Sequence, residues 1–190
     1  AETPKSIRQG SVGKPFFNQE VEIANKDDEG IGEIRVKGPN LMIGYYEMEE
    51  KTNEVLKDGW FYTGDLGYID EDGFLFLSGR IKRIILTTGN GNAYKVFPNV
   101  PEKVISEYEG VQEVCIVGAN QRNDQVLRAV IVLKEEYRNQ SEKIEKSLRK
   151  WCGERLANHM QPTYYEFIEK MPLTAAGKVD YRKLEELAEK

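Results

Sequence analysis

The sequence predicts a β-rich segment over residues 1–80, followed by a small α+β domain over residues 81–190. In the first part polar and apolar residues alternate, as in Glu20–Ala24, which is the period-two pattern of a half-buried strand. In the second part apolar runs of strand length, such as Ala129–Leu133, alternate with helical stretches. The junction Arg80–Arg83 between these patterns is short, so we expect either a rigid fusion or a hinge.

The β-rich segment contains several strand candidates and one helix candidate. The Asp-Gly step in Asp70–Gly73 supplies the positive φ that a tight hairpin needs, so Gly67–Ile69 is expected to pair with Phe74–Phe76. A calcium loop is the alternative for this acidic turn, but position twelve counted from Tyr68 is Gly79 and not the required glutamate. The remaining predicted elements are strands over 20–24, 32–38, 41–46 and 60–62, and a helix over 49–56.

The second part is predicted to contain short strands and three helices. Asn99 and Ser141 are expected to cap the first two helices, with Glu102 completing a capping box behind Asn99. The apolar residues Ile144, Leu148 and Cys152 recur at helical steps and predict the buried face of the second helix. The other predicted elements are a strand pair at 84–86 and 94–97, central strands at 114–117 and 129–133, a strand at 163–168, and a helix at 179–188.

The composition excludes several classes of function. The chain has 190 residues and a formal charge of −5 with both signs scattered along it, which argues against a nucleic-acid-binding surface. It has no apolar run of membrane-spanning length, so no transmembrane segment is expected. Cys115 and Cys152 are interpreted as reduced, buried thiols, and this predicts a cytoplasmic protein.

Asp65 and Arg80 are the most informative polar residues, since they stand fifteen residues apart at either end of the predicted hairpin. Glycines around Asp65 permit a tight turn and an exposed carboxylate, which can accept hydrogen bonds from two sugar hydroxyls. The planar guanidinium of Arg80 suits hydroxyl or phosphate oxygens. A turn aspartate that bonds its own backbone and a surface arginine are the structural alternatives, and the residues alone leave both open.

Two further segments carry candidate polar groups. Lys178 follows the small residues of Leu173–Gly177, so its ammonium is expected to protrude, either as a catalytic cation or as a solvated surface lysine. The glycines of Thr87–Asn92 suggest a phosphate cradle, but the third glycine of a dinucleotide fingerprint is replaced by Tyr94, which favours a plain hairpin loop. His159 has no cysteine, histidine or acid at metal-ligand spacing, so no metal site is predicted.

The order of these motifs resembles that of the adenylate-forming, or AMP-binding, enzymes. This family includes acyl-CoA synthetases, the amino-acid-activating domains of nonribosomal peptide synthetases and beetle luciferases. The resemblance covers nearly the whole chain and rests on 10–15, 32–34, 38–39, 44–46, 59–65, 70–73, 79–80, 94–98 and 173–178. It implies that residues 1–80 are the end of a large domain with a distorted β-barrel, and that residues 81–190 are a mobile C-terminal domain.

The resemblance also implies roles for five residues. Asp65 and Arg80 would hold the ribose of ATP and of the acyl-adenylate, and Lys178 would bridge substrate oxygens during adenylation. Lys82 falls at the family's hinge position, and the loop around Gly89 would face the tunnel for the CoA arm. ATP, with its Mg²⁺, and CoA are therefore the expected ligands, together with a carboxylic acid.

Two positions differ from the family pattern. The glutamate that usually follows the phenylalanine-proline step by two residues is replaced by Val100, although Glu102 keeps the second acid. The asparagine that usually precedes the glycine-lysine step is replaced by Ala176. Neither position is a proposed catalytic group, but both weaken the assignment of a subfamily.

The resemblance favours part of an acyl-CoA synthetase that activates a carboxylic acid, expected to be a fatty acid, as an acyl-adenylate and transfers it to CoA. The family's phosphate loop and acyl pocket are not in this sequence, so the N-terminal portion of the large domain is expected to be missing and this chain to be inactive alone. One alternative is an adenylation enzyme that loads a carrier protein, and another is a non-catalytic binding or regulatory module.

Overall fold

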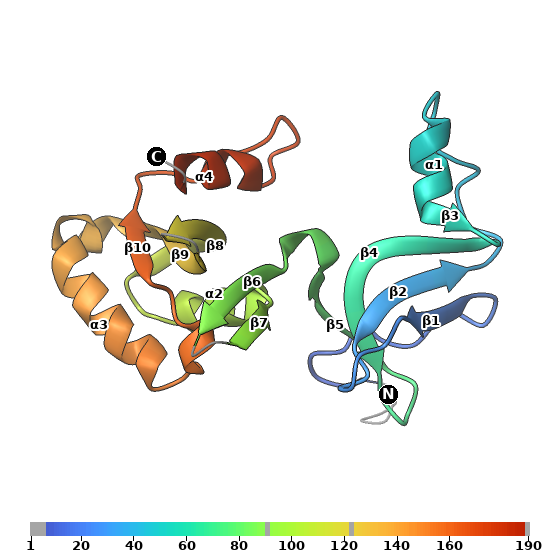
Figure 1. Ribbon diagram of the computed structural model, residues 1–190, viewed down its shortest axis with the longest axis horizontal. Helices are drawn as coiled ribbons and strands as arrows, with labels where there is room; N and C mark the ends of the chain where they lie inside the picture. The colour runs from blue at the N-terminus through green and yellow to red at the C-terminus, as the bar shows by residue number, and fades with distance from the viewer. Residues whose placement is uncertain (1–6, 90–91, 122–123, 189–190) are drawn as a thin grey trace. The chain divides into compact units, whose positions relative to one another are not determined.

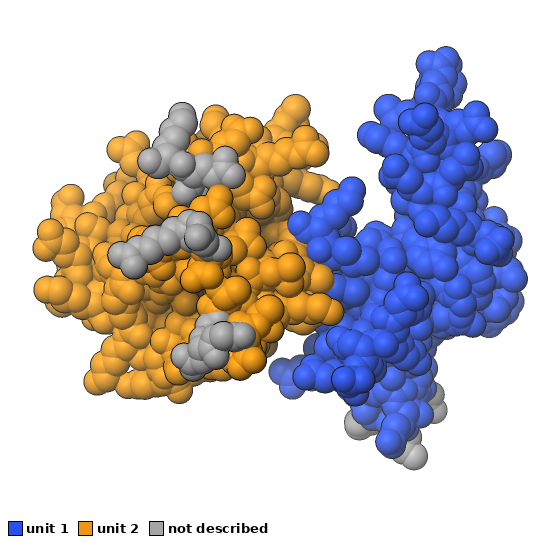
Figure 2. All heavy atoms as spheres, in the orientation of Figure 1, with its two compact units in different colours: residues 1–82 blue, residues 83–190 orange. Residues whose placement is uncertain are grey.

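The computed structural model describes residues 7–89, 92–121 and 124–188, and the chain divides into two compact units (Figures 1 and 2). Unit 1 comprises residues 1–82 and unit 2 residues 83–190. Unit 1 is a curved β-sheet and unit 2 is an α+β domain. A β-rich segment followed by a small α+β domain is the organisation that the sequence predicts.

Unit 1 is an antiparallel sheet with the strand order β1-β2-β4-β3, and β5 also pairs with β4. The long strand β4 curves along its length (Figure 1). It pairs with β2 between Phe61 and Gly67, with β3 at Trp60 and Phe61, and with β5 from Asp65 to Ile69. The elements are β1 (Glu20–Ala24), β2 (Gly32–Lys37), the helix α1 (Glu49–Val55), β3 (Leu56–Lys57), β4 (Trp60–Ile69) and β5 (Leu75–Arg80).

The hairpin between β4 and β5 forms as predicted, with Tyr68 opposite Phe76 and Ile69 opposite Leu75. Asp70 Oδ1 accepts the backbone N–H groups of Asp72 at 3.0 Å and Phe74 at 2.9 Å, which closes the turn. The Asp70 side chain therefore shapes a tight turn, which is the role predicted for this segment.

The predicted strand at 41–46 is wrong, because this segment is irregular and pairs with no strand. The segment is held by hydrogen bonds to Thr52 of α1 instead. Thr52 Oγ1 accepts the Tyr45 N–H and donates to the Met48 carbonyl oxygen, both at 2.9 Å. The predicted short strand at 60–62 is the beginning of β4, which continues through Asp65 to Ile69.

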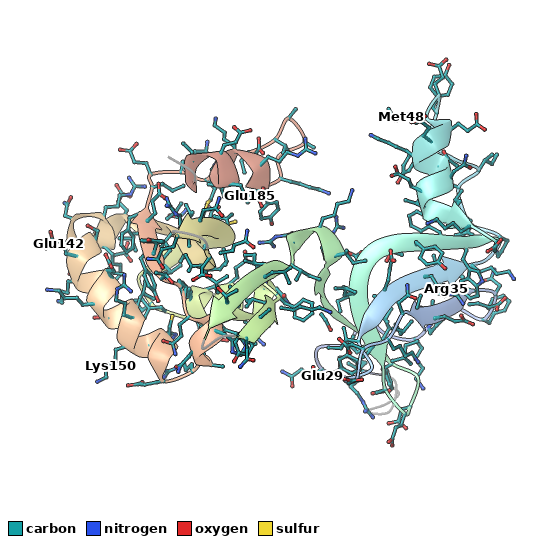
Figure 3. All side chains as sticks on the ribbon, viewed as in Figure 1. Glu29, Arg35, Met48, Glu142, Lys150 and Glu185 are labelled. Carbon is teal, nitrogen blue, oxygen red and sulfur yellow. The ribbon has the colours of Figure 1, made fainter. Side chains whose placement is uncertain are left out.

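Unit 1 buries few apolar side chains. Among its described residues, Ile34 and Phe74 are the buried ones, each 4% exposed. The side chain of Arg35, labelled in Figure 3, contacts two aromatic residues of β4. Its guanidinium carbon lies 4.5 Å from the Trp60 ring centroid, and its Nη1 donates to the Tyr62 hydroxyl at 3.1 Å. Strand pairing and such half-buried polar–aromatic contacts therefore hold unit 1 more than a closed core does.

Unit 2 has a three-stranded sheet, β10-β9-β8, in which β8 is antiparallel and β10 parallel to β9. A separate hairpin is formed by β6 and β7. The elements are β6 (Ile85–Gly89), β7 (Asn92–Val96), α2 (Asn99–Ser106), β8 (Val111–Gln121), β9 (Asp124–Leu133), α3 (Ser141–Gly153), β10 (Tyr164–Phe167) and α4 (Tyr181–Ala188).

Both faces of this sheet are covered by apolar side chains. Ile116, Ile131 and Leu148 belong to the larger buried cluster, which also includes residues of α2 and of the β6–β7 hairpin. Cys115 and Leu184 belong to a second cluster that includes α4. The outer side of α3 carries Glu142 and Lys150, which project away from the sheet, so the helix is amphipathic as predicted (Figure 3).

Three predictions for unit 2 are corrected by the structure. Neither Asn99 nor Ser141 caps its helix by a side-chain hydrogen bond; Pro98 and Gln140 occupy the cap positions. Strand β8 is buried on both faces but lies at an edge of the sheet, whereas β9 is central as expected. The hairpin loop predicted over Thr87–Asn92 is shorter, because β6 extends to Gly89 and β7 begins at Asn92. Residues 90–91 of that prediction lie outside the described residues.

Candidate functional site

Asp65 and Arg80 lie directly opposite each other in the register of β4 and β5. Arg80 Nε lies 2.8 Å from Asp65 Oδ1, and the two side chains are 68% and 30% exposed. The structure therefore brings these predicted site residues together as an ion pair on the surface of unit 1. At this exposure the pair contributes little to stability, of the order of 0–1 kcal/mol, so both groups retain surface on which a ligand could bind.

A β-bulge sets the position of this pair. Leu66 pairs with Gly79, but Gly67 pairs with Leu77, so Ser78 has no partner across the hairpin. A bulge bends the strand and redirects the side chains beside it. Gly67 is required here, because a Cβ atom on it would lie 2.2 Å from the Phe76 carbonyl oxygen.

Two neighbouring polar side chains hold the backbone that presents Asp65. Thr63 Oγ1 donates to the Ile34 carbonyl oxygen at 2.8 Å and accepts the Asp65 N–H at 3.1 Å. Glu33 Oε1 accepts the Gly64 N–H at 3.0 Å. No local pattern indicates these supporting roles, since Glu33 and Gly64 meet only when β2 pairs with β4.

Lys178 lies on an exposed loop of unit 2 that is closed by an isolated bridge between Leu173 and Val179. Thr174 holds the loop from within: its N–H donates to the Lys178 carbonyl oxygen at 2.7 Å, and its Oγ1 accepts the Lys178 N–H at 3.3 Å. Gly177 has a φ of 74°, a left-handed conformation that favours glycine. The backbone at Lys178 is therefore ordered while its ammonium is exposed to solvent.

Lys82 and Gly89 occupy different parts of the chain. Lys82 is exposed in a short 3-10 helix, Ile81–Arg83, and it is the last residue of unit 1. Gly89 is the last residue of β6 and pairs with Asn92. The unit boundary thus falls directly after the residue that the family resemblance places at the hinge.

Arg83, the first residue of unit 2, was not singled out from the sequence. Its Nη2 lies 2.5 Å from Glu102 Oε1, and its Cζ lies 4.0 Å from the centroid of the Tyr181 ring. Burial disfavours the charged guanidinium, but the hydrogen bond and charge of Glu102 outweigh it, and the pKa of Arg83 is raised. Glu102 Oε1 also accepts the Ile116 N–H at 2.9 Å, which explains why this acid does not cap α2.

His159 stacks on Tyr94, with ring centroids 4.4 Å apart and planes 10° from parallel. Across the described ranges, no group of three or more histidine, cysteine, aspartate or glutamate side chains is placed to hold a metal ion. The same part of the chain contains no helix with the length and apolarity to cross a membrane.

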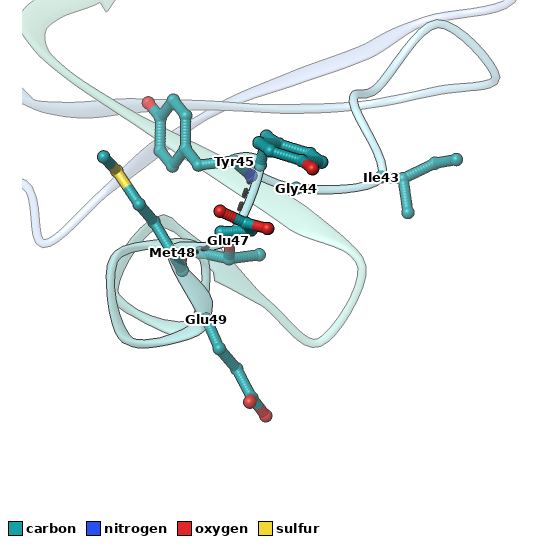
Figure 4. A pocket seen from close by; sticks show the side chains of 8 residues that line it. Ile43, Gly44, Tyr45, Glu47, Met48 and Glu49 are labelled. Carbon is teal, nitrogen blue, oxygen red and sulfur yellow. Dashed lines mark hydrogen bonds between the residues drawn. The ribbon is translucent and has the colours of Figure 1, made fainter.

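A hollow of about 620 Å³ lies on unit 1 around Ile43–Glu49 and Thr52 (Figure 4). Its walls are largely exposed: Ile43 is 101% and Tyr46 is 87% exposed. The segment is tied down by the hydrogen bond from the Tyr45 N–H to Thr52, drawn as a dashed line in Figure 4. This hollow is an uncovered apolar surface and not an enclosed ligand pocket.

Comparison with known proteins places this architecture in one family. Residues 101–178 match the AMP-binding enzyme C-terminal domain. The chain is 35% identical over 184 residues to a long-chain-fatty-acid–CoA ligase of Bacillus subtilis, covering 93% of this chain and 31% of that protein. It is 40% identical over 177 residues to a 2-succinylbenzoate–CoA ligase of Listeria monocytogenes, covering 93% of this chain and 35% of that protein.

A solved structure supports the same assignment. The o-succinylbenzoate CoA synthetase of Bacillus subtilis, in complex with its acyl-adenylate intermediate, aligns with a TM-score of 0.81 and 31% identity over 92% of this chain and 35% of that one. The chain therefore contains an AMP-binding enzyme C-terminal domain at residues 101–178, and over nearly its whole length it is similar to part of the AMP-binding acyl-CoA ligases. It spans about a third of the length of the relatives that it matches.

Proposed function

We propose that the native protein containing this chain is an ATP-dependent, AMP-forming acid–thiol ligase. In the first half-reaction a carboxylate oxygen attacks the α-phosphorus of ATP, which forms an acyl-adenylate and releases pyrophosphate. In the second, the thiol of CoA attacks the acyl carbonyl, which forms a thioester and releases AMP and a proton. A fatty acid is the proposed substrate, since relatives of this chain are named for fatty-acid and succinylbenzoate ligation.

One observation carries this proposal: an exposed Asp65–Arg80 pair stands on a bulged hairpin in a chain that aligns with a synthetase solved with its acyl-adenylate. A carboxylate is an acceptor only, so Asp65 is suited to accept hydrogen bonds from two ribose hydroxyls. Arg80 engages Asp65 through Nε, and its outer guanidinium nitrogens are suited to the same ribose or to phosphate oxygens.

Lys178 is proposed as the catalytic cation of the first half-reaction. Negative charge builds up on the phosphoryl oxygens as the carboxylate oxygen attacks, and a nearby ammonium stabilises that charge. The ordered, exposed loop that carries Lys178 suits a residue that must reach a ligand outside its own unit. Mg²⁺ is proposed only as the usual companion of ATP.

The second half-reaction is proposed to need a different arrangement of the two units. Rotation about Lys82 would withdraw Lys178 and bring the β6–β7 hairpin near Gly89 to the path of CoA. The position of Lys82 at the last residue of unit 1 supports this assignment. A hinge of this kind needs only a few backbone dihedral angles to change.

Unit 1 is proposed to complete its core with the rest of a large domain that also supplies the phosphate loop and acyl pocket. The exposed apolar residues of unit 1, with Phe17 at 102% and Ile43 at 101%, support this. Large exposed apolar patches mark contact surfaces. The 190-residue chain is therefore expected to be inactive by itself, and the complete enzyme is expected in the cytoplasm.

The test is pyrophosphate release by the native protein with ATP and carboxylic acids of short, medium and long chain, with and without CoA. Release should require an acid and fall by about 100-fold or more in Lys178→Ala, the size expected when a charge-stabilising group is lost. Lys183→Ala, an exposed lysine on α4, is the matched control and should retain activity.

The same assay separates the alternatives. AMP formation that requires a phosphopantetheinyl carrier protein in place of CoA would favour a carrier-loading enzyme. No pyrophosphate with any acid, or release that is indifferent to Lys178, would leave a non-catalytic binding module as the better account.

A further inference from the structure

We infer that Arg83 is a positioning residue that couples the junction between the units to the loop of Lys178. This inference rests on the proposed function for its catalytic meaning. The link consists of Arg83, Glu102 and Tyr181 with the backbone of Ile116, and we refer to it as the Arg83 clasp. It joins the first residue of unit 2 to α2, β8 and α4 at once.

The clasp fixes the start of unit 2 firmly. The Arg83 and Glu102 side chains are only 21% and 18% exposed, so their ion pair is partly shielded from solvent. Glu102 uses the same oxygen to accept the Ile116 N–H at 2.9 Å, and Arg83 Nη2 lies 3.4 Å from the Ile116 carbonyl oxygen. Because Arg83 is held on these sides, rotation at the junction is confined to the residues before it, which include Lys82.

The third contact of the clasp leads to Lys178. The Arg83 guanidinium carbon lies 4.0 Å from the Tyr181 ring centroid, a distance typical of a cation–π interaction. Tyr181 is the first residue of α4 and follows Lys178 by three positions. The Asp180 N–H donates to the Pro172 carbonyl oxygen at 2.8 Å, which ties this turn to the other end of the Lys178 loop.

The Arg83–Tyr181 contact thus links the junction directly to the segment that carries Lys178, beside the packing of Leu184 of α4 in the second cluster. Without it, the first residue of α4 would lose its contact with Arg83, and the loop would be held less tightly relative to the junction. Rotation at Lys82 would then place Lys178 less reproducibly. Poor placement lowers the rate of adenylation without weakening the binding of substrates that Lys178 does not hold in the ground state.

Arg149 supplies a matched control. It is another arginine of unit 2 that pairs with a glutamate, Glu145, at 2.8 Å and lies 4.6 Å from a tyrosine ring, that of Tyr165. It also donates to the Thr163 carbonyl oxygen at 3.2 Å. The control therefore removes the same kinds of contact from the same unit, but at α3 and not at the junction.

The experiment measures amide hydrogen exchange of the 190-residue chain over residues 173–181 in Arg83→Gln and Arg149→Gln. We expect exchange there to rise about 10-fold in Arg83→Gln and to stay within about two-fold in Arg149→Gln. Tyr181→Leu, which removes the ring, should reproduce Arg83→Gln. Equal exchange in Arg83→Gln and Arg149→Gln would overturn the inference.

A second readout uses the native enzyme. Arg83→Gln should lower kcat for pyrophosphate release by about 10-fold with KM for ATP and for the acid within about two-fold, and Arg149→Gln should alter neither. An unchanged kcat in Arg83→Gln would contradict the positioning role of Arg83. If the unsubstituted enzyme released no pyrophosphate, the proposed function would fail, whereas hydrogen exchange would still decide whether the clasp holds the loop.

Discussion

Units 1 and 2 are of comparable length but bury their apolar side chains very differently. Unit 2 covers both faces of its three-stranded sheet, and its buried residues form two clusters. In unit 1 the described residues bury only Ile34 and Phe74, and many large apolar side chains are exposed. Unit 2 has the buried apolar clusters that a domain needs to fold alone. Unit 1 instead exposes large apolar side chains, as surfaces that contact another part of a protein do.

The largest effect that would test this comparison is a cavity in unit 2. Leu148 is fully buried in the larger cluster, so Leu148→Ala should destabilise unit 2 by about 3 kcal/mol, measured by urea unfolding. Leu75→Ala truncates a half-buried leucine of β5 in unit 1 and should cost about 1 kcal/mol or less. Equal losses would show that unit 1 has a core of the same quality, which would contradict the comparison.

The next effect is alkaline destabilisation of unit 2. Burial, with a contribution from the charge of Glu102, raises the pKa of the Cys115 thiol from 9.0 to about 12. The folded state therefore holds the thiol proton more tightly, and this stabilisation is complete below the unfolded pKa and is lost as the pH rises towards the folded one.

Between about pH 8 and about pH 10.5 the free energy of unfolding of unit 2 should fall by about 2 kcal/mol because of this group. Cys115→Ala should lower stability at neutral pH but flatten the alkaline slope. Burial also raises the pKa values of Cys152 and Tyr165, so part of the slope should remain. A slope that Cys115→Ala leaves unchanged would show that this thiol does not titrate in that range.

A smaller loss of stability is expected when the cation–π contacts of unit 1 are removed. Trp60 lies under Arg35 at 4.5 Å and Lys37 at 5.7 Å, both measured from the charged group to a ring centroid. Trp60→Leu keeps an apolar side chain but removes these cation–π contacts, so unit 1 should lose about 1 kcal/mol by chemical denaturation. No change in unit 1, or an equal loss in unit 2, would argue against such contacts as its support.

The smallest effect is expected at the uncovered surface of unit 1. Phe17 and Ile43 are fully exposed, so Phe17→Ser and Ile43→Ser should change stability by less than about 0.5 kcal/mol. The same substitutions should reduce binding of a hydrophobic dye to the 190-residue chain. A large loss of stability would show that these side chains are packed within unit 1.

Local patterns in the sequence predicted most elements correctly, because their periodicity follows from the geometry of one strand or helix. Strand β1, helix α1, the β4–β5 hairpin, the face of α3 and helix α4 were all found in this way. The prediction of a strand at 41–46 was wrong because a strand needs a neighbouring strand to pair with. In this segment the Tyr45 N–H donates to the Thr52 side chain instead. The prediction of a capping box at Asn99 was wrong because Glu102 instead pairs with Arg83 and accepts the Ile116 N–H.

The sequence by itself determined the order of the elements and the candidates Asp65, Arg80 and Lys178, since these depend on residue types in a local pattern. It also determined the family resemblance, which added Lys82 and Gly89 as candidates. Only the tertiary structure decided that Asp65 and Arg80 form one pair, because a bulge at Ser78 sets their register. It alone also revealed the Arg83 clasp, whose members are distant in sequence. Such contacts depend on which elements pack together, and no local pattern encodes that.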